Sequence, residues 1–175
     1  MLNTFKSKPK EGYKWYVVYT QSRAEKKAAE YLHDVDIQYF LPLIKTIRQW
    51  SDRKKKVELP LFPSYMFVYV NHTQYYEVLE IPYISRYIFY DGKPASISQK
   101  EIDKIKKLIN ADVEMEVTSE KILPGQQIEI THGLLRGIKG EMVSYKGTNM
   151  VAIKIQQIEF SMLIHVAVNH LKLII

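Results

Sequence analysis

The feature that most constrains this chain is a change of pattern near residue 111. Before that point, segments with strand-type and helix-type periodicity alternate, whereas only short strand-type segments follow it. Residues 111–121 are rich in charge and poor in bulky apolar side chains, which is typical of a linker. The 175-residue sequence therefore predicts two modules, at 13–110 and 122–175, behind a polar tail at 1–12.

The first module has the pattern of an α+β domain, in which helices cover a small sheet. Capping boxes, Ser22 with Glu25 and Ser98 with Glu101, predict one helix over residues 23–33 and another from Ser98 onward. Asn71 or Thr73 is suited to cap a short helix between them. Strands are expected at residues 14–20, 38–41, 65–70 and 84–90, with a protruding hairpin or loop at 43–58.

The second module contains four or five short strands within about fifty residues, a density that predicts a small all-β barrel. Pro124-Gly125 provides a turn before the first of them. The strands are expected at residues 127–131, 141–145, 150–156, 162–168 and 171–174. Because its apolar segment Phe160–Ile164 is suited to edge-to-edge pairing, we expect this module to recruit a second protein.

Charge is divided unevenly between the two modules. Residues 1–111 carry a net charge of +7, whereas residues 112–175 carry −1, and together they give the chain its +6. A basic module beside a nearly neutral one indicates a polyanionic partner for the first module only.

The composition points away from catalysis. The five histidines lack metal-ligand spacing, and the chain contains no cysteine. Gly133, Gly137 and Gly140 lack the lysine and serine or threonine that end a phosphate-binding loop. We therefore expect no enzyme activity, no catalytic residues, no metal site and no cofactor. Without a secretory signal or an apolar run near the roughly 20 residues of a membrane span, a cytoplasmic location is expected.

Two segments are unusually aromatic, Trp15–Tyr19 and Pro60–Phe67. Strand alternation places Tyr16 and Val18 on one face of the first segment, and Trp15, Val17 and Tyr19 on the other. Core packing explains most of these side chains. A small sheet with helices on one face cannot hide both sets, so we expect the surplus to form an exposed patch for a partner.

Basic side chains accompany the aromatic segments and surround Trp50. A solvated charged loop is one explanation, and contact with phosphates, with a base stacked on Trp50, is the other. The candidate nucleic-acid-binding residues are Arg23, Lys26, Lys27, Arg48, Arg53, Lys54, Lys55 and Lys56, with Lys45 beside them.

Three segments carry motifs in a fixed order, WYVVYTQSRAEKKAAEYL, PLFPSYMFV and PGQQIEITHGLLRGIKGEMV. Over nearly the full chain they resemble the NusG family of transcription elongation factors. The first is similar to that family's first strand and helix, the second to its proline-aromatic strand, and the third to its KOW motif. The resemblance implies a NusG-type N-terminal domain, a KOW β-barrel and binding to RNA polymerase.

The resemblance also assigns roles to residues. It implies that Tyr19, Phe62 and Tyr65 form the depression that receives the clamp helices of the largest polymerase subunit. The basic positions of the first helix would face the non-template DNA strand or nascent RNA. The KOW domain would bind a ribosomal or other protein partner.

Within the family, RQWSDRKKKVELPLFPSY is most similar to specialised antitermination paralogs of the UpxY type, relatives of RfaH. These act on selected operons, often for surface polysaccharide. The F-G-R-x-T-P segment of the general factor, which contacts Rho or a ribosomal protein, is replaced here by Ile158–Leu163. A general NusG-type elongation factor and a ribosome- or RNA-binding KOW protein remain the alternatives.

Overall fold

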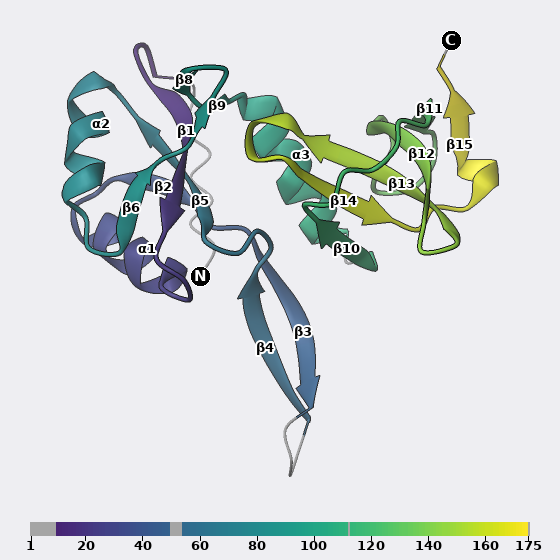
Figure 1. Cartoon of the computed structure of the whole chain (residues 1–175), viewed down its shortest axis with the longest axis horizontal. Helices are drawn as coiled ribbons and strands as arrows, with labels where there is room; N and C mark the ends of the chain where they lie inside the picture. The colour runs from purple at the N-terminus through teal and green to yellow at the C-terminus, as the bar shows by residue number, and fades with distance from the viewer. Residues whose placement is uncertain (1–9, 50–53, 112, 175) are drawn as a thin grey trace. The chain divides into compact units, whose positions relative to one another are not determined.

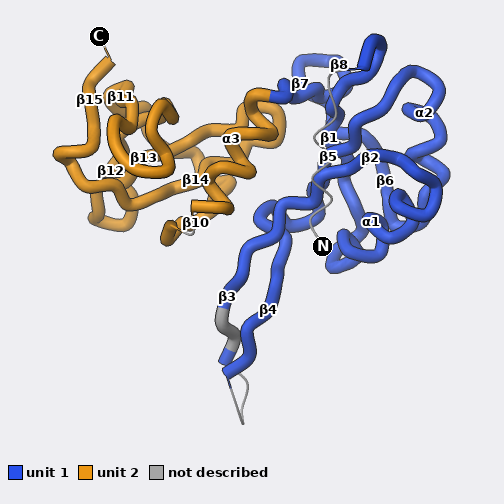
Figure 2. Tube along the Cα trace, turned by 180° about the vertical axis from the view of Figure 1, so that it is seen from behind, with its two compact units in different colours: residues 1–99 blue, residues 100–175 orange. Residues whose placement is uncertain are grey.

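The computed structural model describes residues 10–49, 54–111 and 113–174. The chain divides into two units, residues 1–99 and 100–175 (Figure 2). Each unit has its own main sheet. None of the helices within these described ranges has both the length and the apolar character needed to cross a membrane.

An antiparallel sheet in the order β2–β5–β1–β6, with β9 also pairing with β1, organises the first unit (Figure 1). β1 and β5 pair continuously from Lys14 opposite Val70 to Tyr19 opposite Tyr65. Both strands are built from aromatic and β-branched residues, which favour extended backbone, and their predicted bounds are confirmed. The strands are β1 (Lys14–Thr20), β2 (Gln38–Phe40), β5 (Tyr65–Val70), β6 (Ile84–Tyr87) and β9 (Ser96–Ile97).

Helices α1 (Glu25–Asp34) and α2 (His72–Glu77), with the 3-10 turn η1 (Val78–Glu80), belong to the same unit. Val18 of β1 packs in one buried cluster with Ala28 and Leu32, which lie one turn apart on the same face of α1. The predicted cap of α2 is also confirmed, because the Asn71 side chain accepts a hydrogen bond from the Gln74 amide at 2.9 Å.

The start of α1 differs from the predicted capping box. The helix begins at Glu25, two residues later than expected, and Ala24 at its N-cap position provides no side-chain hydrogen bond. Arg23 has a φ of +61°, outside helical geometry. The Glu25 carboxylate is instead engaged with Ser64, which lies 39 residues away along the chain. A tertiary hydrogen bond therefore replaces the expected local one.

Two hairpins extend the first unit. β3 (Leu43–Gln49) and β4 (Lys54–Pro60) pair from Leu43 opposite Pro60 to Gln49 opposite Lys54, which confirms the predicted protruding hairpin (Figure 1). The predicted strand at 84–90 is divided in two. Its second part, β7 (Phe89–Tyr90), pairs with β8 (Lys93–Pro94) in a small hairpin of its own.

The second unit contains α3 (Gln99–Asn110) and a six-stranded antiparallel sheet in the order β10–β14–β13–β12–β11–β15. The first residue of α3, Gln99, is the last residue of the first unit. Over the described part of the predicted module 122–175, which ends at residue 174, the strand-only content is confirmed apart from two 3-10 turns, η2 (Gln156–Ile158) and η3 (Val168–His170). Closure of the sheet into a barrel stays a prediction. The strands are β10 (Met115–Thr118), β11 (Gln126–Ile130), β12 (Lys139–Tyr145), β13 (Thr148–Ile155), β14 (Phe160–Ile164) and β15 (Leu171–Leu173).

The prediction of a linker at 111–121 is wrong for residues 115–118, which form strand β10. The predicted domain boundary at residue 110 also differs from the observed division, which follows Gln99. β10 pairs with β14, and the Glu116 carboxylate accepts hydrogen bonds from Lys146 Nζ and from the Tyr145 hydroxyl, the latter at 3.2 Å. The charge that suggested a solvated linker is thus paired with the β12–β13 hairpin, a contact that local composition does not reveal.

Two glycines of the KOW-like segment serve different purposes. A Cβ on Gly125 would lie 1.6 Å from the Met142 carbonyl oxygen, so close approach of two backbones, rather than the turn expected there, requires glycine. Gly137 has open space around it but a φ of +84°, a conformation that side-chain-bearing residues rarely adopt.

Candidate binding surfaces

Tyr19 and Tyr65 lie side by side on neighbouring strands of the first unit. They are directly opposed in the β1–β5 register, and their rings meet edge to face with centroids 5.3 Å apart. Both rings are partly accessible. Arg86 is opposite Tyr19 on β6, and its guanidinium carbon lies 5.1 Å from the centre of the Tyr19 ring. The row Tyr65–Tyr19–Arg86 therefore combines two aromatic rings with a cation.

Phe62 does not share this surface. Its side chain is fully buried and packs edge to face on Phe67, with ring centroids 6.4 Å apart. The expectation that Phe62 belongs to an exposed aromatic patch is therefore wrong. Its position in the turn before β5 places the ring in the core, whereas Tyr65, three residues later, remains accessible.

The turn between Phe62 and Tyr65 is held from two sides. The Tyr65 amide donates to the Phe62 carbonyl at 3.1 Å, and the Thr20 amide donates to the Ser64 carbonyl at 2.8 Å. Ser64 has a φ of +65°, and its own amide donates to the Glu25 carboxylate at 2.8 Å. These bonds fix the backbone beside Tyr65 and make Glu25 a positioning residue for the aromatic row.

Glu25 and Arg86 were both missed by sequence reasoning. Glu25 was interpreted as half of a capping box, although it is 5% exposed and bonded across the fold. Arg86 is the single cation of the short strand β6, and no sequence pattern links it to Tyr19. Only the β1–β6 register places the two side by side.

The predicted nucleic-acid-binding residues fall into two groups on different elements. Arg23, Lys26 and Lys27 are exposed at the beginning of α1, and Lys54, Lys55 and Lys56 are exposed along β4. Strand geometry directs Lys54 and Lys56 to one face of the hairpin and Lys55 to the other. Arg48 belongs to β3 opposite Lys55. Arg53 and Trp50 lie outside the described residues.

In the second unit, the segment expected to pair edge to edge with a protein is not at an edge. β14 lies between β10 and β13 in the sheet, and its residues from Ser161 to Ile164 are buried. The predicted docking of Phe160–Ile164 is therefore wrong, because both of its backbone edges are already paired. The end strands of this sheet are β10 and β15.

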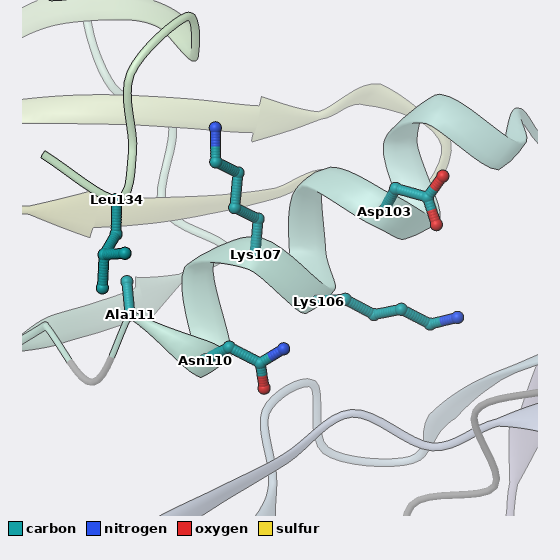
Figure 3. Close-up of a pocket in the computed structure, with 6 residues that line it drawn as sticks. All are labelled: Asp103, Lys106, Lys107, Asn110, Ala111 and Leu134. Carbon is teal, nitrogen blue, oxygen red and sulfur yellow. The ribbon is translucent and has the colours of Figure 1, made fainter. Parts of the chain in front are cut away.

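Two shallow hollows of about 390 and 460 Å³ lie along α3 in the second unit. Figure 3 shows the first, where Lys106 and Lys107 point in different directions from the helix. The Lys107 ammonium donates to the Arg136 carbonyl at 2.7 Å. The second hollow is lined mainly by cations, namely Lys100, Lys104, Lys107, Arg136 and Lys139, with Asp103 among them.

The family model described as "Transcription termination factor nusG" matches residues 13–106, more than half of the chain. This protein belongs to the NusG family. All of the predicted polymerase-binding and nucleic-acid-binding residues, from Tyr19 to Tyr65, lie within the matched region of this NusG-family chain.

Curated relatives of this NusG-family protein support the same assignment at low identity. "Transcription termination/antitermination protein NusG" of Pasteurella multocida is 28% identical over 157 residues, covering 81% of this chain and 86% of the relative. The protein of the same name from Rickettsia felis is 25% identical over 142 residues, with coverages of 75% and 74%.

Among solved structures, "Domain interaction in Thermotoga maritima NusG" is similar, with a TM-score of 0.51 at 23% identity. The similarity covers 91% of this chain and 96% of that one, and it shows the NusG-like fold. NusG-family factors are non-enzymatic, in agreement with the expectation that this chain is not an enzyme. Within the described ranges, no group of three or more histidine and acidic side chains is arranged to hold a metal ion.

Proposed function

We propose that this NusG-family protein binds RNA polymerase through the accessible Tyr19–Tyr65 pair and suppresses pausing or termination during transcription. The observation that carries the proposal is the aromatic row, which a buried turn holds rigidly at the end of β1. Rigid, partly exposed aromatic side chains are typical energetic centres of protein interfaces. The partner surface is the clamp helices of the largest polymerase subunit. Arg86 provides a cation beside the tyrosine pair that contacts them.

A second contact of this protein is with nucleic acid, either the non-template DNA strand or nascent RNA. The exposed cations at the beginning of α1 and along β4 support this assignment. The KOW domain recruits a further protein, ribosomal or other. Because β14 is enclosed in the sheet, that partner must use another part of the second unit.

The protein acts on selected operons, among them those for surface polysaccharide, as a specialised paralog of the UpxY type. The replacement of F-G-R-x-T-P by Ile158–Leu163 supports this specialisation. In the structure this stretch runs from η2 into the buried strand β14, so few of its side chains are available to Rho. Its gene is expected at the head of a long operon, whereas a general elongation factor has no such requirement.

The polymerase contact is tested by replacing Tyr19 and Tyr65 with alanine, singly and together. Removing an aromatic residue from the centre of an interface costs about 2 kcal/mol or more, so each single variant is expected to bind polymerase roughly thirtyfold more weakly. Purified polymerase is titrated with labelled protein, and relief of pausing is measured in the same samples.

Phe89→Ala is the matched control, because Phe89 is 63% exposed but lies on the β7–β8 hairpin. It is expected to bind as the wild type does. Phe62→Ala is expected to behave differently from the tyrosine variants and lower the free energy of unfolding by about 3–5 kcal/mol, as for other buried phenylalanines. Wild-type affinity in a folded Tyr19→Ala, Tyr65→Ala double variant would contradict the proposed contact.

A further inference from the structure

Cations gather on one face of the second unit. The hollow of about 460 Å³ along α3 is lined by residues of that helix, of the loop 131–138 and of the start of β12. All but one of its cationic side chains are exposed to solvent, and Lys104 is partly exposed. We call this surface the cationic hollow, and its cations are Lys100, Lys104, Lys107, Arg136 and Lys139.

The helix α3 contributes three of these cations. Lys100, Lys104 and Lys107 follow one another at intervals of four and three residues, so they lie along one face of the helix, about one turn apart. Like charges at this spacing destabilise a helix. Asp103 is the one acidic side chain among the described residues that line the hollow, and it offsets only part of the charge. A bound anionic group would therefore relieve repulsion along α3.

The loop 131–138 holds the remaining cations against the helix. The Lys107 ammonium donates to the Arg136 carbonyl at 2.7 Å. The Gly137 amide donates to the Ile130 carbonyl at 2.8 Å, and the Ile130 amide donates to the Ile138 carbonyl at 2.9 Å. These bonds fix the backbone on both sides of Arg136, whose planar guanidinium is suited to pair with a carboxylate through two hydrogen bonds.

Outside the cationic hollow, the second unit is acidic. Residues 100–175 contain ten lysine or arginine residues and nine aspartate or glutamate residues. Five of these cations and one of these acids line the hollow, which leaves five cations and eight acids elsewhere, a net charge of −3. Two of the remaining cations, Lys146 and Lys154, are paired with Glu116 and Glu141. The positive charge of this unit is therefore concentrated at the hollow.

An apolar side chain adjoins the cations. Leu134, two residues before Arg136, is 71% exposed. It lines the neighbouring hollow of about 390 Å³, close to Ala111 just beyond the end of α3 (Figure 3). The two hollows share Asp103 and Lys107. A ligand that spans both hollows meets cations and then an apolar side chain, a combination that suits a protein segment with acidic and apolar residues.

We propose that the cationic hollow receives an acidic segment of the protein that the second unit recruits, with an apolar side chain of that segment on Leu134. The inference rests on the proposed recruitment of a protein by this unit, and it names the chemistry of that partner. A short acidic segment ends within the hollow. A nucleic acid, in contrast, would continue over the surrounding surface of net negative charge and be repelled there.

The test titrates the full-length protein, at low salt, with a fluorescently labelled synthetic peptide in which leucines are interspersed among glutamates. A peptide with glutamine in place of every glutamate is the comparison probe. Wild type is expected to bind the acidic peptide more tightly, with an affinity that falls as salt is added. An exposed ion pair typically contributes about twofold in affinity, so the variant Lys104→Gln, Lys139→Gln is expected to bind the acidic peptide roughly fivefold more weakly.

Lys121→Gln, Lys172→Gln is the matched control, because it removes two exposed cations of the same unit that do not line the hollow. It is expected to bind the acidic peptide as the wild type does. Leu134→Ser changes no charge, and it is expected to weaken binding of the leucine-bearing peptide but not of a peptide made of glutamates alone. Equal loss in the two lysine variants overturns the proposal, because net charge rather than the hollow would then explain binding.

Labelled DNA and RNA, single-stranded and double-stranded, are titrated against the same variants. A nucleic-acid affinity that Lys104→Gln, Lys139→Gln leaves unchanged supports the proposal. Loss of nucleic-acid binding in this variant, without loss of acidic-peptide binding, would assign phosphates to the hollow and overturn it.

Polymerase binding and operon read-through in cells are measured as well. Lys104→Gln, Lys139→Gln is expected to bind polymerase normally and to lose read-through, and unchanged read-through overturns the hollow as the recruitment site. A wild type that binds polymerase but not the acidic peptide overturns the hollow and leaves the polymerase contact standing. Peptide binding without polymerase binding overturns the proposed function and leaves the hollow standing.

Discussion

Glu141 lies at the centre of a small hydrogen-bonded group in the second unit. Its carboxylate accepts from the Lys154 ammonium at 2.9 Å, from the Gln127 side-chain amide at 3.1 Å and from the Gly125 backbone amide at 3.5 Å. Burial raises the pKa of Glu141, but these three donors outweigh it and hold the pKa below its ordinary value. The ionised carboxylate therefore stabilises the fold at neutral pH.

At the residue scale, Glu141→Gln is expected to lower the free energy of unfolding by about 1 kcal/mol at neutral pH. Because the pKa is lower in the folded state, this contribution is present above the ordinary glutamate pKa of about 4.3 and is lost as the pH falls through the folded value. Urea unfolding of both proteins across the acidic range measures it.

The two stability curves are expected to converge at acidic pH. Glu120→Gln, at an exposed position outside this hydrogen-bonded group, is the control and is expected to follow the wild type. A difference that stays constant at all pH values would show that packing, rather than the charge of Glu141, stabilises this site.

At the scale of elements, sequence patterning did not reveal β10. Its four residues pair in register with β14, from Met115 opposite Ile164 to Thr118 opposite Ser161. Both Thr118 and Ser161 are buried, so removing β10 would expose the edge of β14 and the side chains beneath it. We therefore expect β10 to be an integral part of the second sheet.

Two fragments test this expectation. One begins at residue 113 and retains β10, and the other begins at residue 122, where composition alone would place the start of the domain. The longer fragment is expected to be more stable by about 2 kcal/mol, since each cross-strand pair contributes a few tenths to one kcal/mol. Thermal and urea unfolding of the two fragments measure the difference, and equal stability would show that β10 is dispensable.

At the scale of the whole molecule, the two units divide the work. The aromatic row, the α1 cations and the β3–β4 hairpin all belong to the first unit, and the six-stranded sheet belongs to the second. Residues 1–99 carry a net charge of +5, whereas residues 100–175 carry +1 and are nearly neutral. This difference supports our proposal that the first unit contacts nucleic acid and the second recruits a protein.

A fragment of residues 1–111, which retains α3, is expected to bind polymerase and relieve pausing as the full-length protein does in a purified system. In cells it is expected to lose the activity that depends on the recruited partner. Binding is measured by titration against polymerase, and operon read-through is measured in a strain that lacks the full-length gene. Loss of polymerase binding by this folded fragment would show that the two units act together.

Several parts of this fold follow from local sequence. The bounds of β1 and β5 are predicted to the residue, and Asn71, which caps α2, is one of the two candidates that the sequence offers, because strand propensity and capping depend on neighbouring side chains. The buried stripe of α1 follows from its helical period. The division into a mixed and a strand-only part likewise follows from periodicity, and the resemblance to the NusG family follows from two motifs in order.

Other features depend on partners that are distant in the sequence. Phe62 and Tyr65 have similar rings in one turn, yet packing on Phe67 buries the first and leaves the second accessible. Glu25 bonds to Ser64 rather than to its own helix, and Glu116 is paired with Lys146 rather than solvated. The sequence alone determined most of the elements and the family, because both are encoded in short-range patterns. Only the tertiary structure decided which aromatic and charged side chains remain available for binding. Burial and pairing depend on strand register and on contacts between segments that are distant in the sequence.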